Sequence, residues 1–369
     1  MAQVVKEIEK LFAMMQKYHA TDLHLKSGAP PIFRVQKSVR RMEREALTND
    51  QIATLVYDIM TPGLKQTFEE TGQVDFAYSV PGVGRYRINV YRQRGSVSVA
   101  VRRVEFDIPS VAELNLPEAV NRIAQYEQGL ILIAGITGSG KSTTLAALID
   151  QVNATRRCHI ITIEDPIEYL YQDKVGFVNQ REVGIDVSDY HDALKYVVRQ
   201  DPDVILIGEL RDSVGVETSL IAAETGHLVF GTVHAASCAQ IPGRILDMFT
   251  VDRHPQIRQL LFFNLRAAMV QKLLKGTKPE TPLVPVMEIM FCNPTVRKLI
   301  REGGDNKISD AILAAHEEGM QTMNQSLEAL IRSGMIAERV GMDNSPNPEQ
   351  LRMALKGIRL GADEGGIIG

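Results

Sequence analysis

The residues best able to do chemistry form one continuous stretch, Gly135 to Ser142, which matches the pattern G-x-x-x-x-G-K-[ST]. An apolar run at 130–134 precedes it and a helical pattern at 143–152 follows it, as this motif requires. Its glycines allow successive backbone N–H groups to turn inward around an anion, and the helix adds its positive amino-terminal end. The stretch therefore predicts a loop that binds a polyphosphate.

The side chains of this loop have distinct expected roles. Lys141 should reach the β- and γ-phosphates, and the Ser142 hydroxyl should take one position on Mg²⁺, with phosphate oxygens and waters as the other ligands. ATP and Mg²⁺ are therefore the expected cofactors. The expected nucleotide contacts are Gly135, Ile136, Thr137, Gly138, Ser139, Gly140, Lys141, Ser142 and Thr143.

Acidic residues follow the next apolar run, at 160–163, and we expect them beside the phosphate loop. Hydrolysis needs a group that orients a water, which is worth ~10²–10⁴-fold in rate, and Glu168 is our candidate for this base. Glu164 and Asp165 are candidates for binding Mg²⁺ through water or for ordering the loop. The alternative is that carboxylates before Pro166 only cap the next turn.

A second acidic strand runs from Asp203 to Glu209 and is expected to approach Mg²⁺ through water. Gly208 stands where nucleotide hydrolases commonly have an Asp, so Glu209 is the remaining acidic group.

Two histidines, His227 and His234, stand at the ends of an apolar run at 228–233. They could hydrogen-bond the γ-phosphate and transmit its loss, or they could be satisfied structural groups, which their spacing alone favours. No Cys or His accompanies them at ligand spacing, which argues against zinc.

The elements that must position these residues change in character along the chain. Apolar runs at 130–134, 160–163, 204–207 and 228–233 alternate with helical segments, which predicts a parallel sheet with ligands at the carboxyl ends of its strands. After residue 296 the pattern is helical, including 323–331, and the Gly-rich segment 361–369 is expected to be mobile.

The amino-terminal part reads as a small α+β domain. Val4, Ile8, Leu11 and Met15 have helical spacing within 4–18, and short alternating strands surround a second helix expected at 50–68. Pro109 and Pro117 mark a linker. The predicted division is 1–105, linker 106–117, an ATPase domain with carboxyl-terminal helices at 118–342, and a tail at 343–369.

A predicted hairpin, 85–92 and 97–102, displays Arg87 and Arg102 away from its apolar face. Two arginines on a rigid sheet could bind phosphate in a neighbouring site. The pattern alone favours a solvated basic edge that discourages strand pairing.

Composition bounds the remaining possibilities. The 369 residues include 41 basic and 45 acidic side chains, so the net charge of −4 does not indicate a general surface for duplex DNA. The three cysteines form no pair at metal spacing and suit a reducing cytoplasm. No apolar run is long enough to span a bilayer and no signal-peptide core is present, so we expect any membrane role to come through partners.

Taken together, the motifs resemble the type IV pilus retraction ATPases, the PilT and PilU group of the secretion ATPase superfamily. The similarity covers about residues 5 to 335. It is carried by the phosphate loop, the acidic box, the second acidic strand and the histidine box, and by three further segments: Thr21–Leu25, Gln180–Gly184 and Thr295–Glu302.

This resemblance implies an α/β fold: a RecA-like P-loop ATPase domain with a PAS-like α+β domain before it and helices after it. It implies a homohexamer with nucleotide between neighbouring subunits, and catalytic roles for Glu168, Glu209, His227 and His234. It also implies that Arg87 and Arg102 reach the nucleotide, which reverses the preference drawn from the pattern alone, since an arginine finger can be worth ~10³–10⁵ in rate. Ser142, Glu164 and Glu209 are the expected groups around Mg²⁺.

The function expected from the resemblance is ATP-driven pilus retraction, and hence twitching motility. The motor would work at the cytoplasmic face of the inner membrane, on a platform protein and with a possible second retraction ATPase, without nucleic acid and without membrane insertion. One alternative is an accessory retraction ATPase that hydrolyses little. Others are a pilus-assembly or type II secretion ATPase, against which the lack of paired cysteines argues, and a RecA-like nucleic-acid motor, against which the net charge argues.

Overall fold

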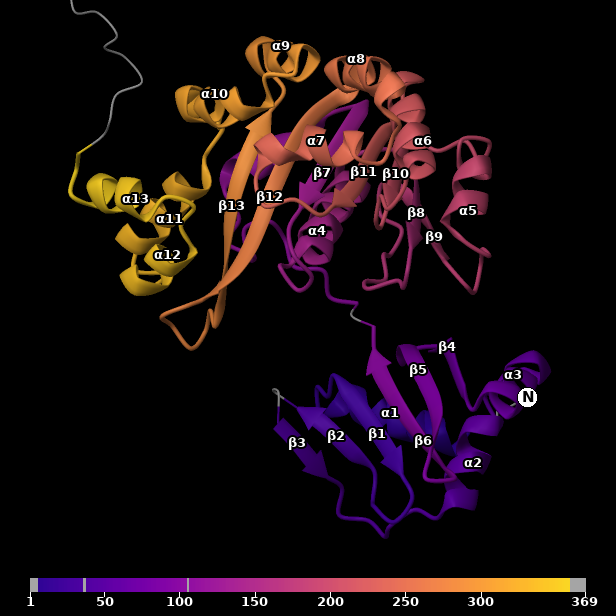
Figure 1. Cartoon of the computed structure of the whole chain (residues 1–369). Helices are drawn as coiled ribbons and strands as arrows, with labels where there is room; N and C mark the ends of the chain where they lie inside the picture. The colour runs from indigo at the N-terminus through magenta and orange to yellow at the C-terminus, as the bar shows by residue number, and fades with distance from the viewer. Residues whose placement is uncertain (1–5, 36–37, 105, 359–369) are drawn as a thin grey trace, which may run out of the picture. The chain divides into compact units, whose positions relative to one another are not determined.

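The computed structural model describes residues 6–35, 38–104 and 106–358, and these form two compact units (Figure 1). One unit holds the chain up to Asp107 together with residues 168–170, and the other holds the remainder. Each has its own cluster of buried apolar side chains. The expected helical residue Val4 and the expected mobile segment 361–369 lie outside the described residues.

The first unit is built on an antiparallel sheet whose six described strands have the order β3-β2-β1-β6-β5-β4. The strands are β1 (Asp22–Lys26), β2 (Ile32–Val35), β3 (Ser38–Arg41), β4 (Gln73–Val80), β5 (Gly84–Gln93) and β6 (Ser96–Arg103), and the helices are α1 (Glu7–Lys17), α2 (Asn49–Tyr57) and α3 (Pro62–Thr71). Helix α1 buries Ile8, Leu11 and Met15 of its predicted stripe, and its Phe12 stacks on Tyr86 with 4.2 Å between ring centroids. The Tyr86 hydroxyl donates to the Phe12 carbonyl at 3.0 Å, which satisfies a fully buried polar group.

The single helix expected at 50–68 is wrong, because the structure has two helices there. Proline has no N–H, and its ring clashes with the carbonyl four residues earlier, so α2 cannot continue through Pro62. Pro62 instead begins α3, and the Thr61 hydroxyl caps that helix by accepting from the Leu64 N–H.

The second unit is built on a seven-stranded sheet with the order β13-β12-β7-β11-β10-β8-β9. All neighbouring pairs are parallel except β12 and β13. The strands are β7 (Gly129–Ala134), β8 (His159–Glu164), β9 (Phe177–Glu182), β10 (Val204–Ile207), β11 (Leu228–Val233), β12 (Leu265–Lys275) and β13 (Leu283–Phe291). The four predicted strands are confirmed, and β9, β12 and β13 were not predicted.

Helices connect and flank these strands: α4 (Lys141–Thr155), α5 (Tyr190–Val197), α6 (Ser213–Glu224), α7 (Ile241–Leu246) and α8 (His254–Asn264). The carboxyl-terminal helices are α9 (Pro294–Glu302), α10 (Ile308–Ala314), α11 (Met323–Arg332), α12 (Glu338–Asn344) and α13 (Pro348–Leu355). Figure 1 shows α10 to α13 on the side of the edge strand β13, against which α11 packs. No helix in the described part of the chain is long and apolar enough to cross a bilayer.

Two details bear on the predicted division of the chain. Val111 and Leu116, inside the predicted linker 106–117, are buried in the core of the second unit. The part of the predicted tail that the structure describes contains α12 from residue 343 onward and α13, whose Leu351 is buried in the same core.

Strand order decides which loops meet at the carboxyl edge of the parallel sheet. Strands β11 and β10 lie between β7 and β8. At about 4.8 Å per strand, the ends of β7 and β8 are therefore roughly 14 Å apart. The loops after β11 and β10, which carry His234 and Glu209, lie nearer to the phosphate loop than the segment after β8 does.

Candidate functional site

The loop from Gly135 to Gly140 packs so closely on β12 that two of its positions require glycine. A Cβ on Gly135, which has φ 148°, would lie 2.4 Å from the Gln271 carbonyl oxygen. A Cβ on Gly140, which has φ 87°, would lie 2.7 Å from the Gln271 Nε2 atom. The positive φ values at both positions, and the backbone contact at Gly135, favour glycine, and its lack of a side chain lets the loop lie close to β12.

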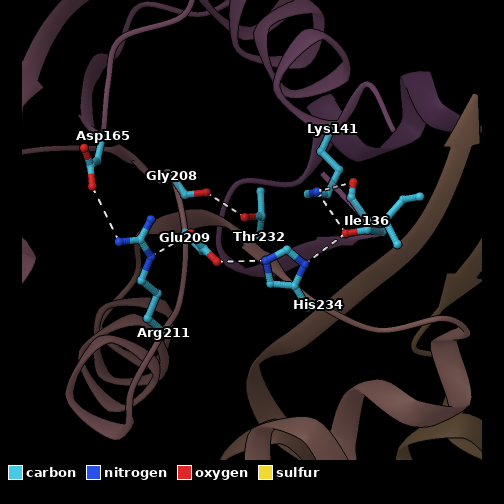
Figure 2. Close-up of polar contacts among 9 residues, drawn as sticks. Ile136, Lys141, Asp165, Gly208, Glu209, Arg211, Thr232 and His234 are labelled. Carbon is cyan, nitrogen blue, oxygen red and sulfur yellow. Dashed lines mark hydrogen bonds and ion pairs between the residues drawn. The ribbon is translucent and has the colours of Figure 1, made fainter. Parts of the chain in front are cut away.

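Lys141 begins α4, and its ammonium group faces the loop (Figure 2). Its Nζ atom donates to the carbonyls of Gly135 and Ile136, each at 2.9 Å. Burial lowers the pKa of Lys141, while the charge of Glu209 acts in the opposite direction. The nearby Ser139 hydroxyl is buried and has no hydrogen-bond partner among the described residues. A cation and a hydroxyl without a partner therefore lie at the same small turn, and a bound phosphate would accept hydrogen bonds from both.

His234, directly after β11, connects this loop to Glu209 (Figure 2). Its Nε2 atom lies 2.9 Å from Glu209 Oε1, and its Nδ1 atom lies 3.2 Å from the Gly135 carbonyl oxygen. Burial acts to raise the pKa of Glu209, but Arg211 and His234 outweigh burial and hold it below its usual range. The imidazole therefore joins the phosphate loop to the acidic group that follows β10.

Arg211 is a site residue that we did not predict. Its Nε atom donates to Glu209 Oε2 at 2.7 Å, and its Nη1 atom lies 3.5 Å from Asp165 Oδ2 (Figure 2). The guanidinium thus links the segments after β8 and β10. The sequence shows an arginine two residues after the acidic strand. It gives no signal for which carboxylates this arginine contacts, because one of them, Asp165, is far away along the chain.

The unusual Gly208 also has a structural reason. A Cβ there would lie 2.8 Å from the Tyr190 hydroxyl oxygen, so an Asp does not fit. Burial and the charge of Asp165 raise the pKa of Tyr190, which keeps the phenol neutral. The Thr232 hydroxyl donates to the Gly208 carbonyl at 2.6 Å and fixes the chain here. Tyr190 is a second residue that we did not predict in the site.

Glu164 is the last residue of β8, and β10 and β11 stand between that strand and β7, which leads into the phosphate loop. Its expected place around Mg²⁺ stays a prediction. Its buried carboxylate accepts from the Thr162 hydroxyl at 2.7 Å and from Gln180 Nε2 at 3.2 Å. Glu168 is exposed and belongs to the first compact unit, so its role as base stays a prediction.

His227 lies at the amino-terminal end of β11, the end opposite to His234. Its Nδ1 atom lies 2.9 Å from the Ala222 carbonyl oxygen and 3.2 Å from the Thr225 hydroxyl. Because the strand runs through the sheet, the structure does not bring His227 to the loop of its own chain. A catalytic role for His227 stays a prediction.

The two predicted arginines of the first unit stand side by side. Arg87 on β5 pairs directly opposite Arg102 on β6, and Asp22 on β1 pairs opposite Arg102. The Arg102 Nε atom donates to Asp22 Oδ1 at 2.9 Å, and both arginine side chains are exposed. Like charges directly opposite each other destabilise a sheet, so this pair is better suited to binding an anion than to stabilising the strands.

A cavity of about 270 Å³ lies next to the end of the phosphate loop. Its lining combines apolar side chains with polar ones: Leu114, Leu116, Leu273 and Leu283 on the one hand, and Glu113, Asn115, Thr143, Thr144, Gln271 and Glu280 on the other. A hollow with apolar and hydrogen-bonding groups next to the Lys141 turn suits a flat heterocyclic base attached to a phosphate chain.

A metal would need ligands from outside the protein. The described residues contain no group of three His, Cys, Asp or Glu side chains that could hold an ion. Mg²⁺ bound through phosphate oxygens fits this donor set, with the exposed Ser142 hydroxyl at the start of α4 as a direct ligand and Glu209 near enough to the loop to act through water.

A glycine-rich loop follows β7, an interior strand of a mostly parallel sheet, and its Gly135 carbonyl contacts His234, which in turn bonds Glu209. This arrangement is that of a P-loop ATPase. The family model described as "Type II/IV secretion system protein" matches residues 99–304, more than half of the chain. The chain therefore belongs to that family, within its type IV pilus retraction ATPase group.

Individual relatives support this assignment along nearly the whole chain. The Pseudomonas aeruginosa protein named "Type IV pilus retractation ATPase PilT" is 40% identical over 343 residues, which is 93% of this chain and 99% of that protein. The protein named "Type IV pilus ATPase PilU" from the same organism is 37% identical over 350 residues, 95% of this chain and 91% of that one. A crystal structure of the pilus retraction motor PilT with bound ADP matches with a TM-score of 0.86 and 42% identity, covering 94% of this chain and 99% of that one.

Proposed function

We propose that this ATPase is a Mg²⁺-dependent motor that withdraws type IV pilus subunits and so powers twitching motility. The observation that carries the proposal is the coupling of the phosphate loop to the Glu209–His234 pair. A γ-phosphate in the loop would lie beside the imidazole that also contacts the loop's Gly135 carbonyl at 3.2 Å. Loss of that phosphate would change the hydrogen bonds of His234 and Glu209. The loops after β10 and β11 could then shift with each hydrolysis, which would couple hydrolysis to movement.

The nucleotide would use both sides of the loop. Backbone N–H groups of residues 136–143, the Lys141 ammonium and the Ser139 hydroxyl would bind the phosphates, and the adjoining 270 Å³ cavity would hold the base. The Ser142 hydroxyl would contact Mg²⁺, which, when bound, neutralises charge on the β- and γ-phosphate oxygens.

The remaining chemical roles combine two subunits of a homohexamer. Glu168 would orient the attacking water, and Glu209 would hold waters around the metal. Arg87 and Arg102 would come from a neighbouring subunit and stabilise charge on the transferring phosphoryl group. Their exposed pairing across β5 and β6 supports this assignment.

The partners follow from the mechanical task. We propose that the ring acts at the cytoplasmic face of the inner membrane on a platform protein of the pilus machinery, with a second retraction ATPase as a possible further partner. Neither nucleic acid binding nor insertion into the bilayer is part of this proposal.

A second candidate is an accessory retraction ATPase that hydrolyses little by itself. This candidate is supported by the similarity to PilU, which covers 95% of this chain. Turnover of the purified protein separates the two candidates, because an autonomous motor hydrolyses ATP without its partner ATPase.

The test is ATP hydrolysis by the purified protein, combined with the pilus phenotype of a deletion strain. Lys141→Ala and Glu168→Gln should each lower kcat by about 10²-fold or more. The deletion strain should extend surface pili and fail to withdraw them. Undiminished hydrolysis by Glu168→Gln would remove the base assignment, and normal withdrawal without the gene would remove the motor assignment.

A further inference from the structure

Gln271, on β12, is buried next to the phosphate loop; it lies against the loop at two positions and bonds to α4 at a third. Its Oε1 atom accepts from the Thr144 hydroxyl at 2.7 Å, a buried bond between residues 127 apart in sequence. Its carbonyl oxygen lies 2.4 Å from the place of a Cβ on Gly135, and its Nε2 atom lies 2.7 Å from that place on Gly140. One residue thus contacts both ends of the loop and the first turn of α4.

The register explains why this residue meets the loop. Val270 pairs with Ala134, the last residue of β7, so Gln271 stands opposite the point where the strand becomes the loop. Its side chain is 2% exposed, and a buried amide is costly unless it is hydrogen-bonded. The bond to Thr144 fixes the amide plane and directs Nε2 toward Gly140 and the adjoining 270 Å³ cavity, which Gln271 also lines.

We propose that Gln271 is a positioning residue for the nucleotide. It sets the height of the loop's second half above β12 and therefore the direction of the backbone N–H groups that hold the phosphates. Hydrogen bonds weaken steeply with misalignment, so a shift of several tenths of an ångström at Gly140 weakens several phosphate contacts together. The inference rests on the proposed binding of nucleotide by this loop.

The first test compares the affinity of a fluorescent ADP analogue in three variants of the full chain. Gln271→Leu keeps the size of the side chain and removes the amide, and should raise Kd about tenfold and the KM for ATP with it, with a smaller change in kcat, since it weakens ground-state and transition-state binding alike. Thr144→Val should raise Kd less. Gln271→Leu alone leaves the buried Thr144 hydroxyl without an acceptor and should lower the unfolding temperature. The double variant has no such hydroxyl, so its unfolding temperature should return toward the wild-type value while its Kd stays raised.

A matched control uses the far end of the same helix. The buried Asn153 amide donates to the Gln172 carbonyl at 2.7 Å, about 18 Å along α4 from its start. Asn153→Ala should lower the unfolding temperature and leave Kd unchanged. Wild-type affinity in Gln271→Leu, or recovery of affinity together with stability in the double variant, would overturn the positioning role. Retained binding by Lys141→Ala would instead overturn the proposed nucleotide site itself.

Discussion

At the scale of single residues, the two histidines that flank β11 have different hydrogen-bond partners. His234 bridges Glu209 and the Gly135 carbonyl, whereas His227 bonds to the carboxyl-terminal end of α6. The same residue type at the two ends of a parallel strand faces opposite edges of the sheet, and only the carboxyl edge carries the nucleotide loop.

This difference predicts unequal effects of one substitution. His234→Ala should lower kcat about tenfold or more, because the phosphate loop loses its contact with Glu209. His227→Ala, the matched change at the other end of β11, should cost less. Steady-state ATP hydrolysis by both variants is the measurement, and equal losses would show that contact with the loop is not what matters.

A second prediction at this scale concerns Gly208, which stands where nucleotide hydrolases commonly have an Asp. Gly208→Ala should destabilise the protein by about 1–3 kcal/mol, because its methyl group would lie 2.8 Å from the Tyr190 hydroxyl oxygen. Tyr190→Phe in the same chain should return part of that loss by removing the oxygen. Urea unfolding of the single and double variants measures this, and a double variant no more stable than Gly208→Ala would contradict the explanation.

At the scale of elements, the antiparallel edge strand β13 carries a buried acid that the reaction does not use. The Glu288 carboxylate accepts from the Cys238 backbone N–H at 2.9 Å, and burial raises its pKa. Because the folded pKa lies above the unfolded value, the stability it contributes is fully present below the unfolded pKa. That stability is lost as pH rises through the folded pKa.

Glu288→Gln should therefore stabilise the protein at pH 8, since it keeps an acceptor for Cys238 without the buried charge. The gain in unfolding temperature should shrink as pH falls toward 4.5, where the wild-type carboxyl also becomes neutral. Thermal unfolding of both proteins across this range measures the difference. A gain independent of pH would contradict the role of charge.

At the scale of the whole molecule, we propose that the site is complete only when two subunits meet. The phosphate loop belongs to the second compact unit, and Arg87 and Arg102 belong to the first. This proposal predicts complementation between inactive variants. A subunit with an intact phosphate loop can be completed by the arginines of a neighbour whose own loop is inactive.

Mixing Lys141→Ala with Arg102→Ala subunits should restore part of the ATPase activity that neither variant shows alone, because some interfaces in a mixed ring combine an intact loop with an intact arginine. Hydrolysis measured against mixing ratio should peak at intermediate composition. A flat profile near zero, with mixed rings verified by mass, would count against arginines supplied by a neighbour.

The sequence alone determined the parts of the site that are continuous in the chain. The phosphate loop, the strand before it and the acidic group Glu209 could be predicted because their pattern is local and their backbone geometry follows from residue type. The chemistry implied by Lys141 and Ser142 needed no knowledge of the fold.

Only the tertiary structure decided which distant residues join that loop. Strands β10 and β11 stand between β8, which ends at Glu164, and β7, which leads into the loop. A hydrogen bond between Gln271 and Thr144 joins β12 to the helix that follows the loop. His234, rather than His227, reaches the Gly135 carbonyl. The physical reason is strand order: periodicity shows that a segment is a buried parallel strand, but the neighbours of that strand depend on packing over the whole sheet.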